Sequence, residues 1–171
     1  MTMYQRILVP IDGSSTSNRG LDEAIRLARL TGGRLRLIHV IDELSFALAM
    51  DAYAGYSGDW LKEMQGKGTA LLEEARAKAA EANVGADTVL RDTFKGTVHD
   101  EVIAEAAAMH ADLIVIGTHG RRGLGRWVMG SSAEHILRMA PVPVLLLRAP
   151  EEAAKSEFER FKLPSGTVAA Q

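Results

Sequence analysis

Apolar residues form short continuous runs that predict buried strands. Four of these runs are Arg6–Ile11, Leu35–Val40, Leu113–Ile116 and Val142–Leu147. Nearly continuous apolarity, rather than alternation with polar residues, is typical of parallel strands that are buried on both faces. A weaker run, Thr88–Arg91, predicts an edge strand, which meets water on one side.

Between these runs the apolar positions follow a helical spacing. They recur at intervals of three and four residues, as in a helix that turns one stripe toward a core. Gly32-Gly33 is expected to end the first helix and Pro141 the last. The stripes are Leu21, Ala24, Ile25 and Ala28; Met64, Gly68, Leu71, Ala75 and Ala79; Val102, Ile103, Ala106 and Met109; and Ala133, Ile136, Leu137 and Ala140.

The alternation of strands and helices predicts an α/β fold, a single doubly wound and Rossmann-like parallel sheet with helices on both faces. Ligands of such sheets bind outside the carboxyl ends of the strands. Three segments follow strands in this way: Pro10-Ile11-Asp12-Gly13, Val40-Ile41-Asp42 and Gly117-Thr118-His119-Gly120. The segment Ile41–Gly58 has no clear periodicity and is either a lid or a long variable connection.

The composition indicates one domain and no special partner. The chain has 171 residues, of which 47% are hydrophobic and 25% charged, a composition ordinary for a globular protein. A net charge of −2 disfavours binding to nucleic acid or to an anionic membrane. The absence of cysteine excludes disulfides, cysteine zinc sites and thiol catalysis. The first apolar run is too short for a signal sequence or a membrane span, so we expect a soluble cytoplasmic protein.

The character of the chain changes after Pro150. We therefore expect one domain over residues 1–149 and a C-terminal extension over 150–171. Glu151–Phe161 has the spacing of a short helix, and Leu163–Gln171 has the composition of a flexible tail.

A segment rich in glycine and serine lies between the fourth predicted strand and the last predicted helix. Gly117 follows the strand directly, and Gly130-Ser131-Ser132 opens the helix. Glycines let the backbone approach a ligand closely, and a helix N-terminus favours a phosphate. Ser131 and Glu134 also have the spacing of a capping box, so Ser131 is either a phosphate ligand or a helix cap.

Two known phosphate motifs do not fit this segment. Gly125-x4-Gly130 has the glycine spacing of a P-loop, but Ser131 stands where that motif requires lysine. The dinucleotide pattern Gly-x-Gly-x-x-Gly is absent after the first strand. Positive charge comes instead from Arg121, Arg122 and Arg126, which either contact phosphate or are solvated.

These residues together resemble the universal stress protein family. Its ATP-binding members carry Gly-x2-Gly-x9-Gly-Ser/Thr, and this chain has Gly117-x2-Gly120-x9-Gly130-Ser131. The resemblance covers roughly residues 3–148 and includes the opening Ile7-Leu-Val-Pro-Ile-Asp12-Gly-Ser14 and the closing Ala140-Pro-Val-Pro-Val-Leu-Leu-Leu-Arg148. One departure is Thr97, since relatives often have proline after the glycine at 96.

The resemblance implies a binding site for ATP, with Mg²⁺ held through the phosphates. Pro10 and Asp12 would border the nucleotide, with Asp12 near the ribose or the metal, and Val40 would present backbone groups to adenine. Arg121 is a further candidate contact of the nucleotide. The ribose and phosphates would be held by Gly117, His119, Gly120, Gly130, Ser131 and Ser132.

The resemblance also implies an architecture and an assembly. The five strands of the family stand in the order 3-2-1-4-5, and members commonly form dimers through their last strands. In this chain the last strand is Val142–Leu147, an apolar edge that pairing with a second copy would cover.

The candidate residues favour binding over catalysis. Asp12 and His119 form the only plausible acid–base pair at the predicted edge, and each has a plainer interpretation, as a turn residue and as an exposed loop imidazole. His39 is expected to be structural, and His99, His110 and His135 lack metal-ligand spacing. The first hypothesis is an ATP-binding regulator or sensor with possible protein partners. The alternatives are a slow ATPase or phosphotransferase, and a member that acts through its surface without nucleotide.

Overall fold

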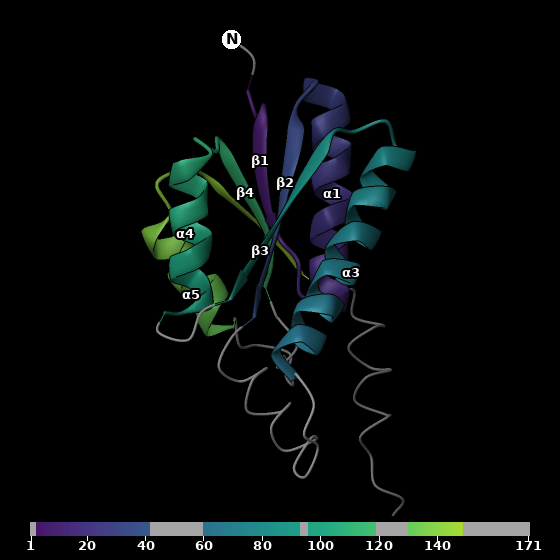
Figure 1. The fold of residues 1–171 in the computed structure, drawn as a ribbon. Helices are drawn as coiled ribbons and strands as arrows, with labels where there is room; N and C mark the ends of the chain where they lie inside the picture. The colour runs from purple at the N-terminus through teal and green to yellow at the C-terminus, as the bar shows by residue number, and fades with distance from the viewer. Residues whose placement is uncertain (1–2, 42–59, 93–95, 119–129, 149–171) are drawn as a thin grey trace, which may run out of the picture.

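The fold is a parallel sheet covered by helices on both faces (Figure 1). The computed structural model describes residues 3–41, 60–92, 96–118 and 130–148. The five strands stand in the order β3-β2-β1-β4-β5, and every strand pair is parallel. This confirms the predicted fold class and strand order.

The observed strands agree with the apolar runs to within two residues at each end. The weak run became a strand at the sheet edge, as predicted. The last strand begins two residues later than predicted, after Pro143, which has no N–H to donate to a ladder. The strands are β1 Arg6–Pro10, β2 Arg34–Ile41, β3 Ala86–Asp92, β4 Leu113–Gly117 and β5 Val144–Leu147.

Four described helices connect the strands. The first ends at Thr31 and has Gly32 as its C-cap. The φ of Gly32, 71°, is left-handed and its N–H donates to the Ala28 carbonyl, so the predicted glycine stop is confirmed. The last ends at Met139, just before Pro141. The helices are α1 Ser15–Thr31, α3 Trp60–Glu81, α4 Val98–Ala108 and α5 Ser131–Met139.

Two apolar cores lie on the two faces of the sheet. Alternate residues of one strand point to opposite faces, so Ile7 and Val9 of β1 pack under α1 and α3, whereas Leu8 packs under α4 and α5 (Figure 1). Leu21 and Ala24 of α1 lie in the first core, and Ile136 of α5 in the second. Most positions of the helical stripes predicted from the sequence therefore face the sheet, and one is clearly exposed.

The exception is Leu137, which the spacing assigned to the buried stripe of α5. Its exposed fraction is 45%, because Ala133 and Ile136 alone face the core and the helix ends at Met139. That prediction was wrong. A helix of this length presents few residues to the sheet, and the predicted apolar stripe included one residue too many.

A buried carboxylate fastens α4 to the sheet. Only 3% of the Glu105 side chain is exposed, and its two oxygens accept from Arg36 of β2 at 2.6 Å and from Arg91 of β3 at 2.9 Å. Burial opposes the charged form of Glu105, but the hydrogen bonds from the two arginines outweigh it and lower the pKa of this carboxyl. The network therefore joins one helix to two strands.

Several sequence predictions fall outside the described residues. These are the lid or connection over 41–58, of which only Ile41 is described, as the last residue of β2, the boundary at residue 149, and the helix and tail of the C-terminal extension.

Candidate functional site

The turn after β1 carries Asp12 at the carboxyl edge of the sheet. The Asp12 carboxylate accepts from the Ser14 amide at 2.9 Å, and the Asp12 amide donates to the Ser17 hydroxyl oxygen at 3.2 Å. Ser14, not Asp12, is the N-cap of α1, since its side chain accepts from the Ser17 amide. Asp12 is therefore a turn residue, and its partly exposed carboxylate stands beside the start of α1.

Strand β2 holds this turn from the other side. The Ile11 amide donates to the Ile38 carbonyl at 2.8 Å, and the Ile11 carbonyl lies 2.6 Å from Nδ1 of His39. Val40, the predicted adenine contact, follows His39 near the end of β2 and is partly exposed. Pro10 ends β1 in register with Ile38. The structure thus places Pro10, Asp12 and Val40 at one edge of two adjacent strands.

Gly117 ends β4 directly against the first turn of α1. A Cβ at position 117 would lie 2.7 Å from both the carbonyl carbon and the Cβ of Thr16, which is itself buried. Glycine at this position is therefore required by helix packing, whatever its role toward a ligand. The contact also brings the Asp12 turn and the end of β4 together.

The two ends of the glycine-serine segment are joined by the backbone. Thr118 donates from its amide to the Leu147 carbonyl at 2.8 Å and accepts at its own carbonyl from the Gly130 amide at 2.9 Å. Through the second bond, the start of α5 lies at the end of β4. Gly117, Gly130, Ser131 and Ser132 are therefore neighbours on the carboxyl edge of the sheet.

The N-terminus of α5 has no side-chain cap. Gly130 is its N-cap, in an extended conformation, and no side-chain hydrogen bond caps the helix among the described residues. The capping-box interpretation of Ser131 was wrong, because the helix already begins at Ser131 and a cap must precede it. By contrast, Ser14 caps α1 and Thr97 forms a capping box at α4.

The uncapped end has the properties of an anion site. The first-turn N–H groups of a helix have no acceptor within the helix and carry partial positive charge. Ser131 is exposed and Ser132 is partly exposed, so both hydroxyls stand near this end. The remaining predicted site residues, His119, Gly120 and Arg121, lie outside the described part of the chain.

A surface hollow of about 230 Å³ borders the Asp12 turn on the α1 and α3 face. Residues on both sides of Asp12 help to line it. Its lining mixes apolar and polar residues, with one carboxylate and one ammonium group: Ile11, Gly13, Asn18, Leu21, Leu71, Glu74, Ala75 and Lys78.

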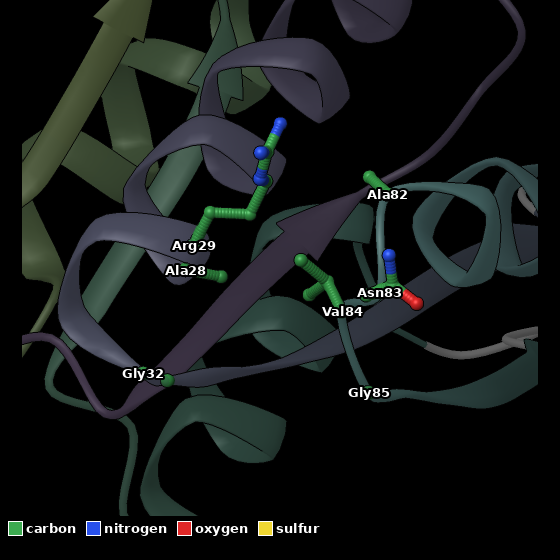
Figure 2. Close-up of a pocket in the computed structure, with 8 residues that line it drawn as sticks. Ala28, Arg29, Gly32, Ala82, Asn83, Val84 and Gly85 are labelled. Carbon is green, nitrogen blue, oxygen red and sulfur yellow. The ribbon is translucent and has the colours of Figure 1, made fainter.

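A larger hollow, of about 460 Å³, lies at the opposite edge of the sheet (Figure 2). It is formed by the turns that follow α1 and α3. Its lining offers backbone groups and small side chains, with Arg29 as its one charged residue: Ala28, Arg29, Gly32, Gly33, Ala82, Asn83, Val84 and Gly85. No acid–base pair or nucleophile is among them, so this hollow gives no support to a catalytic site.

The structure also brings into contact residues that no sequence pattern had connected. The rings of His99 on α4 and His135 on α5 are stacked, with centroids 4.1 Å apart. Thr16 and Thr118 contact or bond the predicted site residues, and neither was singled out by a motif. Among the described residues, no group of three or more histidine, aspartate or glutamate side chains could hold a metal ion.

Comparisons with known proteins agree on one family. The model of the Universal stress protein family matches residues 3–148. Universal stress protein MJ0531 of Methanocaldococcus jannaschii is 31% identical over 88% of this chain and 85% of its own length. Universal stress protein YxiE of Bacillus subtilis is 31% identical over 85% of this chain and its whole length.

Solved structures show the same fold. Hypothetical protein MJ0577 superimposes with a TM-score of 0.74 at 22% identity, over 87% of this chain and 99% of its own. A universal stress protein in complex with cAMP has a TM-score of 0.61 at 22% identity, with 86% and 99% of the chains covered. A universal stress protein of Archaeoglobus fulgidus in complex with dAMP has a TM-score of 0.59 at 20% identity, with 86% and 99% covered.

The part of the chain that the structure describes contains no helix that is both long and apolar enough to cross a membrane.

Proposed function

This chain belongs to the universal stress protein family, and from that premise we propose that it binds ATP at the carboxyl edge of its sheet. Nucleotide binding would make it a cytoplasmic regulator or sensor of a stress response. The bound state would be transmitted through conformation, through dimerisation, or to protein partners.

The observation that carries this proposal is the uncapped N-terminus of α5. Its N-cap Gly130 is bonded to Thr118, which fixes the open end of the helix beside the end of β4. Of the three helices whose N-caps are described, only this one lacks a side-chain cap. A phosphate is the ligand that such an end favours, both in charge and in hydrogen bonding.

The neighbouring residues suit the rest of a nucleotide. Ser131 and Ser132 have hydroxyls that can donate to phosphate oxygens. Asp12 stands at the adjacent strand end, where its carboxylate can accept from ribose hydroxyls or help to hold Mg²⁺, a cation that prefers oxygen ligands. Pro10 and Val40 provide the partly exposed ends of β1 and β2, against which a base can pack.

His119, Gly120 and Arg121 complete the proposed set by their place in the motif. An adenine ligand is also consistent with the cAMP and dAMP complexes of two proteins that share this fold.

A second proposal concerns assembly. Within the part of the chain that the structure describes, β5 is an edge strand that pairs with β4 alone. The Leu147 carbonyl accepts from the Thr118 amide, and the Pro143 carbonyl accepts from the Ile114 amide. Every second residue of this stretch, starting at Pro143, therefore turns its backbone groups toward β4. Val144 and Leu146 therefore direct their backbone groups to the open edge. We propose that a second copy pairs here, through Val142–Leu147, and forms a homodimer.

The proposal is tested by measuring whether the purified protein carries or binds a nucleotide. Protein purified without added ligand is denatured and the released small molecules are identified by mass spectrometry. Isothermal titration calorimetry then compares ATP, ADP and cAMP, with and without Mg²⁺. We expect ATP to bind with a Kd in the micromolar range, which corresponds to a binding free energy of about −8 kcal/mol. Protein that releases no nucleotide and gives no heat with any of the three would refute the proposal.

The rate of phosphate release from ATP distinguishes a nucleotide sensor from a slow ATPase or phosphotransferase. A sensor should release phosphate no faster than a slow background. Multiple turnovers per second that are lost in Asp12→Ala would instead establish an ATPase or phosphotransferase.

A further inference from the structure

We propose that His39 is a positioning residue of the nucleotide site, which fixes the turn that carries Asp12. This inference rests on the proposed function and goes one step beyond it. His39 lies one residue before Val40 on β2, and its side chain reaches across to the end of β1.

The contact is a buried hydrogen bond. Nδ1 of His39 lies 2.6 Å from the Ile11 carbonyl oxygen, and the residue is only 6% exposed. A carbonyl oxygen only accepts, so Nδ1 must carry the proton and donate. A donor lost from this place would leave a buried carbonyl without its side-chain partner, which is costly.

This bond gives Ile11 a second attachment to β2. The Ile11 amide already donates to the Ile38 carbonyl at 2.8 Å, so both polar groups of the Ile11 backbone are held by the neighbouring strand. Asp12 is the next residue along the chain. The direction in which its carboxylate leaves β1 therefore depends on how firmly the Ile11 carbonyl is held.

The turn beyond Ile11 is bonded internally. The Asp12 carboxylate accepts from the Ser14 amide, and the Asp12 amide donates to the Ser17 hydroxyl oxygen. The Ser17 hydroxyl in turn donates to the Pro10 carbonyl at 3.4 Å. These bonds set the shape of the turn but do not tie it to β2. Among the described residues, the His39 ring forms a side-chain hydrogen bond from β2 to the start of this turn.

Helix α3 holds the imidazole in place. A Cβ at Gly68 would lie 2.9 Å from Cδ2 of His39 and 2.8 Å from a methyl of Leu90. The helix therefore approaches His39 more closely than any residue with a side chain permits. Because the ring is packed by α3 and bonded to Ile11, its orientation is fixed before any ligand arrives.

Two substitutions distinguish the effect of the His39 hydrogen bond from the effect of the volume of its ring. Asparagine carries an amide nitrogen on Cγ, as histidine carries Nδ1, so His39→Asn keeps a donor near the Ile11 carbonyl but leaves space against Gly68. His39→Leu fills more of that space but has no donor. We expect His39→Leu to weaken ATP binding by about tenfold or more and His39→Asn by less than about threefold, although both lower the melting temperature.

Calorimetry with ATP and thermal melts of all three proteins make the comparison. A purely structural histidine would give losses of affinity that follow the losses of stability in both variants. That result, or equal affinity in His39→Leu and the wild type, would overturn the inference.

Gly68→Ala provides an independent test, since it displaces the ring without changing its chemistry. It should weaken ATP binding, whereas Gly66→Ala should not, because its added Cβ meets no described atom within 4 Å beyond its own stretch of helix. Unchanged ATP affinity in Gly68→Ala would also contradict the role of His39.

A measurement without nucleotide keeps this inference distinct from the proposed function. Hydrogen exchange of the Asp12 and Ser14 amides, followed by NMR, should be faster in His39→Leu than in the wild type and unchanged in His39→Asn. If the wild type binds no nucleotide but this exchange pattern is found, the proposed function fails while His39 still positions the turn. If the exchange is the same in all three proteins, the positioning role fails even where ATP binds.

Discussion

The backbone amide of Gly130 donates a 2.9 Å hydrogen bond to the carbonyl of Thr118. This bond joins the end of β4 to the start of α5. It places the serines of the motif beside the strand end from which the motif begins. The same strand end abuts Thr16 of α1, so three elements meet at the candidate site.

Gly117→Ala should destabilise the fold. The added Cβ would lie 2.7 Å from two atoms of Thr16, one of them backbone, and neither can move without shifting α1. We expect the free energy of unfolding to fall by about 1–3 kcal/mol, as in overpacked cores. Urea denaturation measures it. Gly85→Ala is the control and should lose far less, because its Cβ meets no described atom within 4 Å beyond its chain neighbours. Equal stability of the two variants would contradict the packing role of Gly117.

Gly130→Val should abolish ATP binding while the protein remains folded. Gly130 has φ −60° and ψ 142°, an extended conformation that valine adopts readily. The branched side chain would stand at the uncapped end of α5 and block the approach of a phosphate. Calorimetry with ATP tests this, with Gly85→Val at the opposite edge of the sheet as the control. Equal ATP heats for Gly130→Val and the wild type would remove the phosphate site from α5.

Glu105→Gln should remove part of the dependence of stability on pH. The folded-state pKa of Glu105 is lowered from its ordinary 4.5 because hydrogen bonds from Arg91 and Arg36 outweigh the effect of burial. A lowered pKa means that the carboxylate stabilises the fold above pH 4.5, and that this stabilisation is lost as the pH falls through the folded-state pKa.

At pH 7 the variant should therefore be less stable by about 2 kcal/mol, the scale of a hydrogen bond to a charged group. The difference should narrow as the pH is lowered below 4.5. Denaturation curves at a series of pH values give the comparison. Glu73→Gln, which breaks an exposed ion pair with Arg76, should change the stability little, because solvent screens such a pair. A constant difference between Glu105→Gln and the wild type at all pH values would contradict the assignment.

Val144→Pro should prevent dimerisation through β5. The Val144 amide faces the open edge of the sheet, so proline removes a donor from that edge and leaves the bonds to β4 in place. Size-exclusion chromatography with light scattering should find a dimer for the wild type and a monomer for the variant. Val144→Thr keeps the amide and the branched shape and should remain dimeric. If Val144→Pro is still a dimer, the copies associate through another surface.

The fold could be read from the sequence because its signals are local. Continuous apolar runs such as Leu35–Val40 show burial on both faces, and Gly32 and Pro141 end helices for reasons contained in their own backbones. Part of the candidate site could be predicted from the sequence for a similar reason. Asp12, Val40 and Gly117 lie at or just after the carboxyl ends of strands, and the carboxyl ends of parallel strands meet at one edge of a sheet.

The roles within the site depended on distance in space rather than in sequence. The Ser131-x-x-Glu134 spacing indicated a capping box, but where the helix begins decides whether a serine can cap it, and α5 begins at Ser131 itself. The mid-strand position of His39 indicated only a structural residue, whereas its bond to Ile11 connects it to the site.

By itself the sequence determined the element order, the sheet and the family motif, since periodicity and spacing are properties of neighbouring residues. The tertiary structure alone decided that Gly117 must be glycine because of Thr16, that Glu105 is buried between two arginines, and that His99 stacks on His135. Each of these contacts joins residues far apart in the chain, and only the packing of helices on the sheet brings them within reach.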